Sequence, residues 1–411
     1  MNIRALTAAL AATIVLPVAV AKATDLEVTH WWTSGGEAAA VGEFAKAFNA
    51  TGNKWVDGAI AGGGSTARPI MISRITGGDP MGATQFNHGR QAQELVEAGL
   101  MRDLTAVAEK GNWKEVIKPA SLLDSCTIDG KIYCVPINIH SWQWLWLNNE
   151  TFEKAGVPVP KDWNEFVAAG PKLKEAGIHP LALGGQAWQA NGLFDTLLLS
   201  LGGKELHEAV YVNKDAEVAA GPEVAKIFAA AGQARELSIG TNVQDWNQAT
   251  NMVLTGRAAG QVMGDWAQGE FQIAGKVAGK DYTCLPGLGV SDYITTGGDA
   301  FYFPVLKSEE GAKAQDALAE VLLAPETQVA FNLKKGSLPV RGDVDLATAN
   351  DCMKKGLEIV AKGNALTSTD QLLSPDSQSQ KQDLMTEFFS STSMTPEAAQ
   401  ERFVEIISSA D

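Results

Sequence analysis

The sequence is poor in the residues that metal sites and many catalytic centres use. It has five histidines and four cysteines among 411 residues. It contains no C-x-x-C, H-E-x-x-H or G-x-S-x-G motif, and no G-x-G-x-x-G opens a helix after a strand-like segment. These absences argue against a zinc protein and against the common hydrolase and dinucleotide-binding classes, and we expect no metal or cofactor.

Positive charge is also scarce. Lys and Arg number 33 against 48 Asp and Glu, which gives a formal net charge of −15. Nucleic acids and anionic membrane surfaces need a cationic face, so neither is an expected partner. Carboxylates are plentiful, however, and a catalytic carboxylate pair of the glycosidase type stays open, because sequence does not give the distance between two carboxylates.

Long apolar runs are lacking except at the N-terminus. Arg4 precedes an apolar segment, residues 5–21, which ends in an A-x-A site at Ala21 to Ala23. This pattern predicts a signal peptide at residues 1–23, export to the periplasm and a mature chain that starts at Thr24. The alternative, a membrane anchor, fits less well because the run is short for a span of about 20 residues.

The four cysteines occur as an even number in a chain with an export signal, which favours two disulfides. Cys126 and Cys134 flank "TIDGKIY", in which Asp129-Gly130 is typical of a tight hairpin turn. The turn would bring these two sulfurs together. Cys284 and Cys352 are left as the second pair.

Strand-like and helix-like segments alternate over the first hundred residues of the expected mature chain: strands at 25–32, 54–61 and 82–87, and helices at 38–49, from Ser65 or Thr66 to Gly77, and at 91–99. This order predicts a parallel sheet covered by helices on both faces. Ligands of such sheets bind beyond the carboxyl ends of the strands. The segments at those ends are "WWTSGGE", "GGGST" and "NHGR". "GGGST" lacks G-K-[ST], which favours a tight turn over a phosphate site.

Tryptophan is abundant, with eleven residues. Several lie beside polar residues or glycine, whereas Trp142, Trp144 and Trp146 alternate and would share one face of a strand. Packing is the alternative for any single one, since tryptophan is mostly buried. As a set, flat apolar faces beside polar groups suit a pyranose, which stacks through its C–H groups and hydrogen-bonds at its rim.

Polar residues at loop starts supply candidate partners for such a rim, because charge-assisted hydrogen bonds are the stronger ones. These candidates are Glu37, Gln85, His88, Asp299 and Lys335. Each has a structural alternative: Glu37 forms a capping box with Ser34, Asp299 serves a turn, and Lys335 is solvated.

Four segments resemble the extracellular solute-binding proteins of bacterial ABC sugar importers, and among these the glucose/mannose-binding type. They are "HWWTSGGEAAAV", "WLWLNNETFEKAGVPVPKDWNEFVAAGPKLKEAGIHPLALGG", "TGRAAGQVMGDWAQGEF" and "KKGSLPVR". The second marks only the wider family, whereas the first and third are more specific to monosaccharide binders.

The resemblance implies an α/β, two-lobed periplasmic binding protein fold of type II, with a mixed, mainly parallel sheet in each lobe and a hinge between the lobes. The N-terminal lobe would comprise residues 24–137 and 291–343, and the C-terminal lobe residues 138–290 and 344–411. The ligand positions that the resemblance and the candidates above give together are Trp31, Trp32, Glu37, Gln85, His88, Trp246, Trp266, Asp299, Lys335 and Gln371. Relatives carry a His near the C-terminus where this chain has "STDQLLSP", so Asp370 or Gln371 would take its place.

The resemblance implies a monomeric periplasmic receptor that binds a monosaccharide and delivers it to an inner-membrane permease. Glucose is the first candidate for this monosaccharide. It would not be an enzyme. The alternative from a different class is a secreted glycoside hydrolase with a tryptophan-lined site and a carboxylate pair. A receptor that feeds chemotaxis or a sensor kinase would show the same sequence features.

Overall fold

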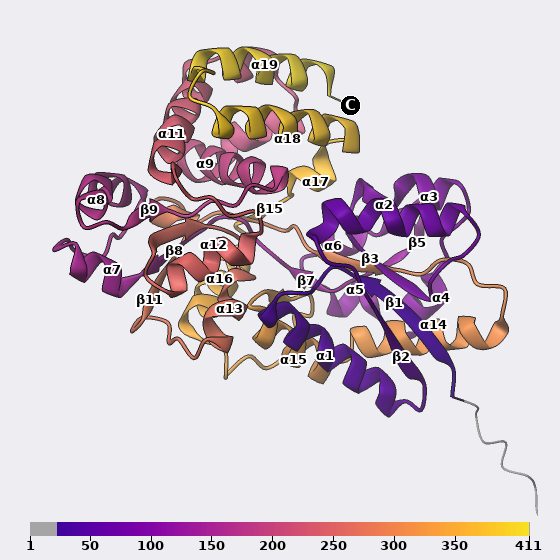
Figure 1. Ribbon diagram of the computed structural model, residues 1–411. Helices are drawn as coiled ribbons and strands as arrows, with labels where there is room; N and C mark the ends of the chain where they lie inside the picture. The colour runs from indigo at the N-terminus through magenta and orange to yellow at the C-terminus, as the bar shows by residue number, and fades with distance from the viewer. Residues whose placement is uncertain (1–22, 411) are drawn as a thin grey trace, which may run out of the picture.

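The computed structural model describes residues 23–410, which form two α/β lobes (Figure 1). The expected signal peptide therefore lies outside the described residues, apart from Ala23. Among residues 23–410, no helix is both long and apolar enough to cross a membrane.

The first lobe is built on a five-stranded sheet with the order β2-β1-β3-β13-β6. β1 pairs in parallel with β2 and β3, whereas β13 is antiparallel to β3 and β6. The strands are β1 (Asp25–His30), β2 (Lys54–Ala59), β3 (Ala83–Asn87), β6 (Cys134–Pro136) and β13 (Asp299–Tyr302). A strand from late in the chain thus completes a sheet begun by the first sixty residues, as a discontinuous lobe requires.

Helices cover both faces of this sheet (Figure 1). α1, α14 and α15 lie on one side, and α2 and α3 on the other. The helices of this lobe are α1 (Gly35–Ala50), α2 (Gly63–Thr76), α3 (Gln93–Glu97), α4 (Thr105–Lys110), α5 (Trp113–Val116), α6 (Ser121–Asp124), α14 (Glu309–Leu322) and α15 (Pro325–Lys335).

The second lobe has a four-stranded sheet with the order β11-β8-β10-β9. β10 is parallel to β9, but β8 is antiparallel to both β10 and β11. This sheet is therefore more antiparallel than expected, since a late strand returns beside β8. Its strands are β8 (Trp144–Asn148), β9 (His179–Leu181), β10 (Ala258–Val262) and β11 (Tyr282–Pro286).

Many helices surround the second sheet, and the C-terminal pair α18 and α19 packs on α9 and α11 (Figure 1). The helices are α7 (Asn149–Lys154), α8 (Trp163–Glu175), α9 (Ala187–His207), α10 (Ala216–Ala219), α11 (Pro222–Ser238), α12 (Trp246–Leu254), α13 (Ala267–Ile273), α16 (Asp351–Ala361), α17 (Thr369–Leu372), α18 (Pro375–Ser390) and α19 (Pro396–Ser409). The C-terminal segment is thus folded, because its apolar residues complete the core of this lobe.

Short paired segments carry the chain between the lobes. β7 (Asn138–Ile139) pairs with β14 (Leu338–Pro339), and β12 (Ile294–Thr295) pairs with β15 (Ala365–Leu366). The buried apolar residues form one core in each lobe and a third, tryptophan-rich cluster beside the second sheet. α16 contributes Met353 to the first core and Cys352 to the third cluster, so the boundary at 343/344 stays a prediction.

Both expected disulfides are confirmed. Cys126 bonds to Cys134 and Cys284 to Cys352. Between the first pair, β4 (Thr127–Ile128) and β5 (Lys131–Ile132) form the expected hairpin. Its two turn residues both have positive φ, 50° at Asp129 and 75° at Gly130, as a two-residue hairpin turn requires.

The two disulfides should contribute unequally to stability. They close loops of 8 and 68 residues. Chain entropy then predicts that the Cys126→Ser/Cys134→Ser variant loses about 2.5 kcal/mol of unfolding free energy and the Cys284→Ser/Cys352→Ser variant about 4.4 kcal/mol. Urea unfolding of both double variants checks this order, and a larger loss for the short loop would contradict it.

Candidate ligand-binding site

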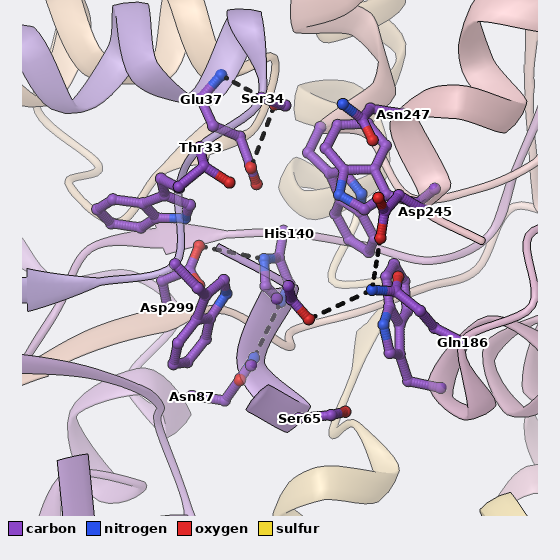
Figure 2. Close-up of a pocket in the computed structure, with 18 of the residues that line it drawn as sticks. Thr33, Ser34, Glu37, Ser65, Asn87, His140, Gln186, Asp245, Asn247 and Asp299 are labelled. Atoms are coloured by element: carbon purple, nitrogen blue, oxygen red, sulfur yellow. Dashed lines mark hydrogen bonds and ion pairs between the residues drawn. The ribbon is translucent and has the colours of Figure 1, made fainter. Parts of the chain in front are cut away.

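A cavity of about 230 Å³ lies between the lobes (Figure 2). Pockets for drug-sized ligands measure roughly 300–1,000 Å³, so this one suits a single small ligand. The residues around it come from strand ends, loops and helices of both lobes. Its lining includes Trp31, Trp32, Thr33, Ser34, Glu37, Gly62, Gly63, Gly64, Ser65, Arg68, Asn87, Gln91, His140, Trp142, Gln186, Trp188, Asp245, Trp246, Asn247, Trp266, Asp299, Lys335, Asp370 and Gln382.

The two adjacent tryptophans after β1 differ in their burial and in their neighbours. Trp31 is half-buried beside the cavity, and its backbone N–H donates to Gln85 Oε1 at 2.9 Å. Trp32 is only 1% exposed and packs its ring against Phe44, Phe301 and Phe331, although its edge reaches the cavity. β1 ends at His30, so both residues lie in the loop after the strand, and the different surroundings of the two rings account for the division.

Glu37 is both a helix-start residue and a member of a buried ion pair. Ser34 is the N-cap of α1: its Oγ accepts from the backbone N–H of Glu37 and donates to Glu37 Oε2 at 3.2 Å. Lys335 Nζ donates to Glu37 Oε1 at 2.8 Å, and both side chains are nearly inaccessible. The first turn of a helix favours a negative charge. The cavity wall therefore holds a fixed carboxylate and a fixed ammonium group.

Asp299 is a second fixed carboxylate, at the start of β13 and 2% exposed. It accepts from Gln85 Nε2 at 2.7 Å and from Asn138 Nδ2 at 3.0 Å, and His140 Nδ1 lies 3.4 Å away (Figure 2). Burial alone would raise its pKa, but the charges of His140 and Lys335 and the hydrogen bonds outweigh burial and hold the pKa of Asp299 well below its usual range. The group therefore stays an ionised hydrogen-bond acceptor.

Three of the predicted ligand residues do not line the cavity. Gln85 lies behind Trp31 and Asp299 and bonds to both. His88 is 1% exposed, and its Nδ1 lies 3.0 Å from Ser125 Oγ and 2.7 Å from Gln371 Nε2. Burial and the charge of His140 lower the pKa of His88 to about 3, so the ring is neutral. Gln371 thus meets His88, while its neighbour Asp370 lines the cavity.

The second lobe contributes a group of aromatic rings. Trp142, Trp188 and Trp266 contact one another with centroid distances of 4.8–6.3 Å, and Trp246 completes the wall. β8 begins at Trp144, so Trp142 precedes the strand and reaches the cavity, whereas Trp144 and Trp146 are buried. The predicted shared face therefore holds only for the last two.

Several lining residues had not been predicted. His140 follows β7, and its Nε2 lies 3.4 Å from Asn87 Nδ2 (Figure 2). Gln186 Nε2 donates to Asp245 Oδ1 at 3.1 Å and to the carbonyl of Gly62 in the other lobe at 3.3 Å. The sequence around His140 and Gln186 is polar, but it does not show that these residues share a site. Only the packing of the two lobes brings them to one cavity.

Asp265 lies near this site without lining it and should make stability depend on pH. It is 2% exposed, Ser141 donates to its Oδ2, and its Oδ1 has no hydrogen-bond partner among residues 23–410. Burial raises its pKa to about 7, against the charges of His140 and Lys335 and the Ser141 hydrogen bonds. The carboxyl therefore stays protonated in the folded protein up to about pH 7, whereas the unfolded chain ionises it near its ordinary pKa.

Asp265→Asn should consequently be more stable than the wild type at alkaline pH. Below about pH 4 the carboxyl is protonated in the folded and unfolded chains alike; as pH rises from there to about 7 the unfolded chain loses this proton while the folded chain keeps it, so the wild type loses stability. The stability gain of the variant should therefore increase by about 2–3 kcal/mol between pH 5 and pH 8. Urea unfolding at both values measures it, and a gain independent of pH would contradict the assignment.

A cavity between two hinged α/β lobes, walled by aromatic rings and fixed charged groups, defines a ligand-binding protein. Residues 32–328 match the family described as bacterial extracellular solute-binding protein. The chain belongs to this family. It is 37% identical over 361 residues to a "Probable sugar-binding periplasmic protein" of Rhizobium meliloti (strain 1021), covering 87% of this chain and 86% of that one.

Solved structures of low sequence identity share the fold. A "Chitin oligosaccharide binding protein" superposes with a TM-score of 0.77 at 22% identity, covering 94% of this chain and 99% of that one. The bacterial solute receptor AcbH, whose structure is described as showing an exclusive preference for β-D-galactopyranose, has a TM-score of 0.75 at 21% identity, with 93% and 98% covered. The expected two-lobed fold class is thereby confirmed.

Proposed function

We propose that this protein is the periplasmic receptor of an ABC sugar importer, and that it binds one monosaccharide between its lobes. Glucose is the first candidate for this monosaccharide. The observation that carries the proposal is the cavity itself. Flat rings from both lobes line it together with two immobilised carboxylates and an immobilised ammonium group. A pyranose offers the matching surfaces, apolar on its ring face and hydroxylated at its rim.

The size of the cavity supports a single sugar ring over an oligosaccharide, since its volume is about 230 Å³. The name of the relative from Rhizobium meliloti supports a sugar as the class of ligand. Donors already in place hold Glu37 and Asp299, and such preorganised acceptors discriminate against a sugar that leaves one of them unpaired. This is how the site would distinguish epimers.

Transport requires that binding change the protein. The lobes would close around the sugar, and the closed form, a monomer, would dock on a membrane permease. Binding shifts this equilibrium only by the difference in affinity between closed and open forms. Here both lobes supply contacts, so the closed form would gain the more favourable set. A chemotaxis receptor or sensor kinase could read the same closed form.

A titration with product analysis separates this proposal from the glycoside hydrolase alternative. Glucose is added to the mature protein while tryptophan fluorescence is followed, and a panel of oligosaccharides is incubated with the protein in parallel. We expect a saturable fluorescence change at micromolar glucose and unchanged oligosaccharides. Cleavage of any oligosaccharide would overturn the receptor assignment.

A further inference from the structure

Arg68 presents an unsatisfied guanidinium to the cavity. It projects from α2, is half-buried, and its Cζ lies 5.8 Å from the ring centre of Trp31. Across residues 23–410, no hydrogen bond and no ion pair within 4 Å engages it, although five N–H groups are available. A half-buried charge without a partner is unfavourable and marks a group that another molecule can satisfy.

The glycine-rich turn before α2 explains how Arg68 reaches this position. A Cβ at Gly64 would lie 2.5 Å from Arg68 Nη1 and 3.4 Å from Trp31 Cε2. Only a residue without a side chain leaves this space open. The segment "GGGST", for which a tight turn was favoured over a phosphate site, thus has a further use: it lets an arginine lie along the cavity wall.

Asp370 faces Arg68 from the other lobe. It lies in α17 and lines the cavity, and its one side-chain hydrogen bond in the described chain comes from Gln378 Nε2 at 3.4 Å. Burial raises its pKa, and the charge of Arg68 opposes that rise more than those of Lys381 and His140 do. The two groups attract each other and both line the cavity, but they do not form an ion pair within 4 Å.

The other charged groups of the cavity are already engaged. Glu37 pairs with Lys335, Asp299 accepts from Gln85 and Asn138, and Asp245 accepts from Gln186. A ligand would therefore find its unused charged donor at Arg68. Because Asp299, Asp245 and Asp370 line the same cavity, a ligand carboxylate would be repelled, whereas neutral hydroxyls would not.

We infer that Arg68 and Asp370 determine specificity by reading two neighbouring hydroxyls of the bound sugar. Arg68 donates hydrogen bonds to both oxygens through its planar fork, and Asp370 accepts a hydrogen bond from one of the two hydroxyls. Since the two residues belong to different lobes, these hydroxyls also link the lobes in the closed form. This inference rests on the proposed function and names the part of the ligand that these residues select.

The test is a thermodynamic cycle between protein variants and deoxy sugars. Calorimetry gives the affinity of the wild type and of Arg68→Gln for glucose and for each of its monodeoxy derivatives. We expect Arg68→Gln to lower glucose affinity by 10- to 100-fold. Removal of a hydroxyl lowers the affinity for the sugar. At two adjacent ring positions this loss of affinity should be at least 10-fold smaller in the variant than in the wild type. At the other positions the loss should be the same in both proteins.

Two further variants serve as a control and as a second test. Arg74→Gln lies on the same helix, and its wild-type guanidinium is held by two bonds to Glu27, at 2.6 and 2.8 Å, away from the cavity. It should keep the wild-type deoxy profile. Arg68→Lys keeps the charge but not the planar fork, so it should keep the recognition of one of the two hydroxyls and lose that of the other. This variant tests the inference if Arg68→Gln does not fold.

The possible outcomes are distinct. If the wild type binds no monosaccharide, the proposed function fails and this inference falls with it. If the wild type binds glucose and Arg68→Gln keeps the same deoxy profile, the inference alone is overturned. A wild type that binds glucuronate more tightly than glucose, with the preference lost in Arg68→Gln, would also overturn it, because Arg68 would then read a carboxylate.

Discussion

Asp299→Asn is expected to lower monosaccharide affinity by about 100-fold while the protein remains folded. The carboxylate is kept ionised by its surroundings and offers a charged acceptor to the cavity. Loss of a buried, hydrogen-bonded charge at a binding site costs roughly 2–5 kcal/mol. The variant also turns one oxygen into an N–H₂ group that faces the donors of Gln85 or Asn138, so a modest loss of stability should accompany the loss of affinity.

Asp265→Asn is the matched control for this effect. Asp265 is another buried aspartate near His140 and Lys335, but it does not line the cavity. Its substitution should leave affinity within about threefold of the wild type, as expected for a group without ligand contact. Calorimetric titration and circular dichroism of both variants give the comparison. Equal affinity losses would mean that Asp299 acts through the fold and not through the ligand.

Lys335→Met is expected to lower the free energy of unfolding by about 3–5 kcal/mol, the largest loss expected from a single substitution here. Lys335 and Glu37 are 2% and 7% exposed, and their direct contact at 2.8 Å joins α15 to the start of α1. Removal of the ammonium group leaves a buried carboxylate whose one remaining side-chain partner in the described chain is Ser34. Urea unfolding at pH 7 measures the loss.

The double variant Glu37→Gln/Lys335→Met separates the penalty of the unpaired charge from the loss of the pair. It should recover 2 kcal/mol or more relative to Lys335→Met, because no buried charge remains. Both variants should lose sugar affinity, since each lacks the ammonium group. A double variant no more stable than the single one would show that Glu37 tolerates burial without Lys335.

Local patterns were enough to predict much of the first lobe. The strand predicted at 25–32 is present as β1, which ends two residues earlier, before Trp31 and Trp32. The turn residues Asp129 and Gly130 predicted the hairpin that closes the first disulfide. For Glu37, the helix cap and the role of hydroxyl acceptor were weighed as alternatives. The structure shows the contact with the N-cap Ser34 and an ion pair with Lys335, and the acceptor role stays a prediction.

The remaining part of the site depends on long-range packing. Asp299 joins Gln85 because β13 returns antiparallel to β3, a pairing with no local signal. His140 lies in a crossover between lobes, and Arg68 faces Asp370 only when the lobes meet. The antiparallel position of β11 beside β8 was missed for the same reason. Sequence periodicity indicates which face of an element is buried, but not which distant element covers it.

A crystal structure of the mature protein grown with saturating glucose tests the central claim most directly. We expect one pyranose between the lobes, with a face against Trp266 or Trp31 and hydroxyls within hydrogen-bond distance of Glu37, Asp299 and Lys335. A sugar bound elsewhere, or a cavity that stays without sugar at saturation, would contradict it.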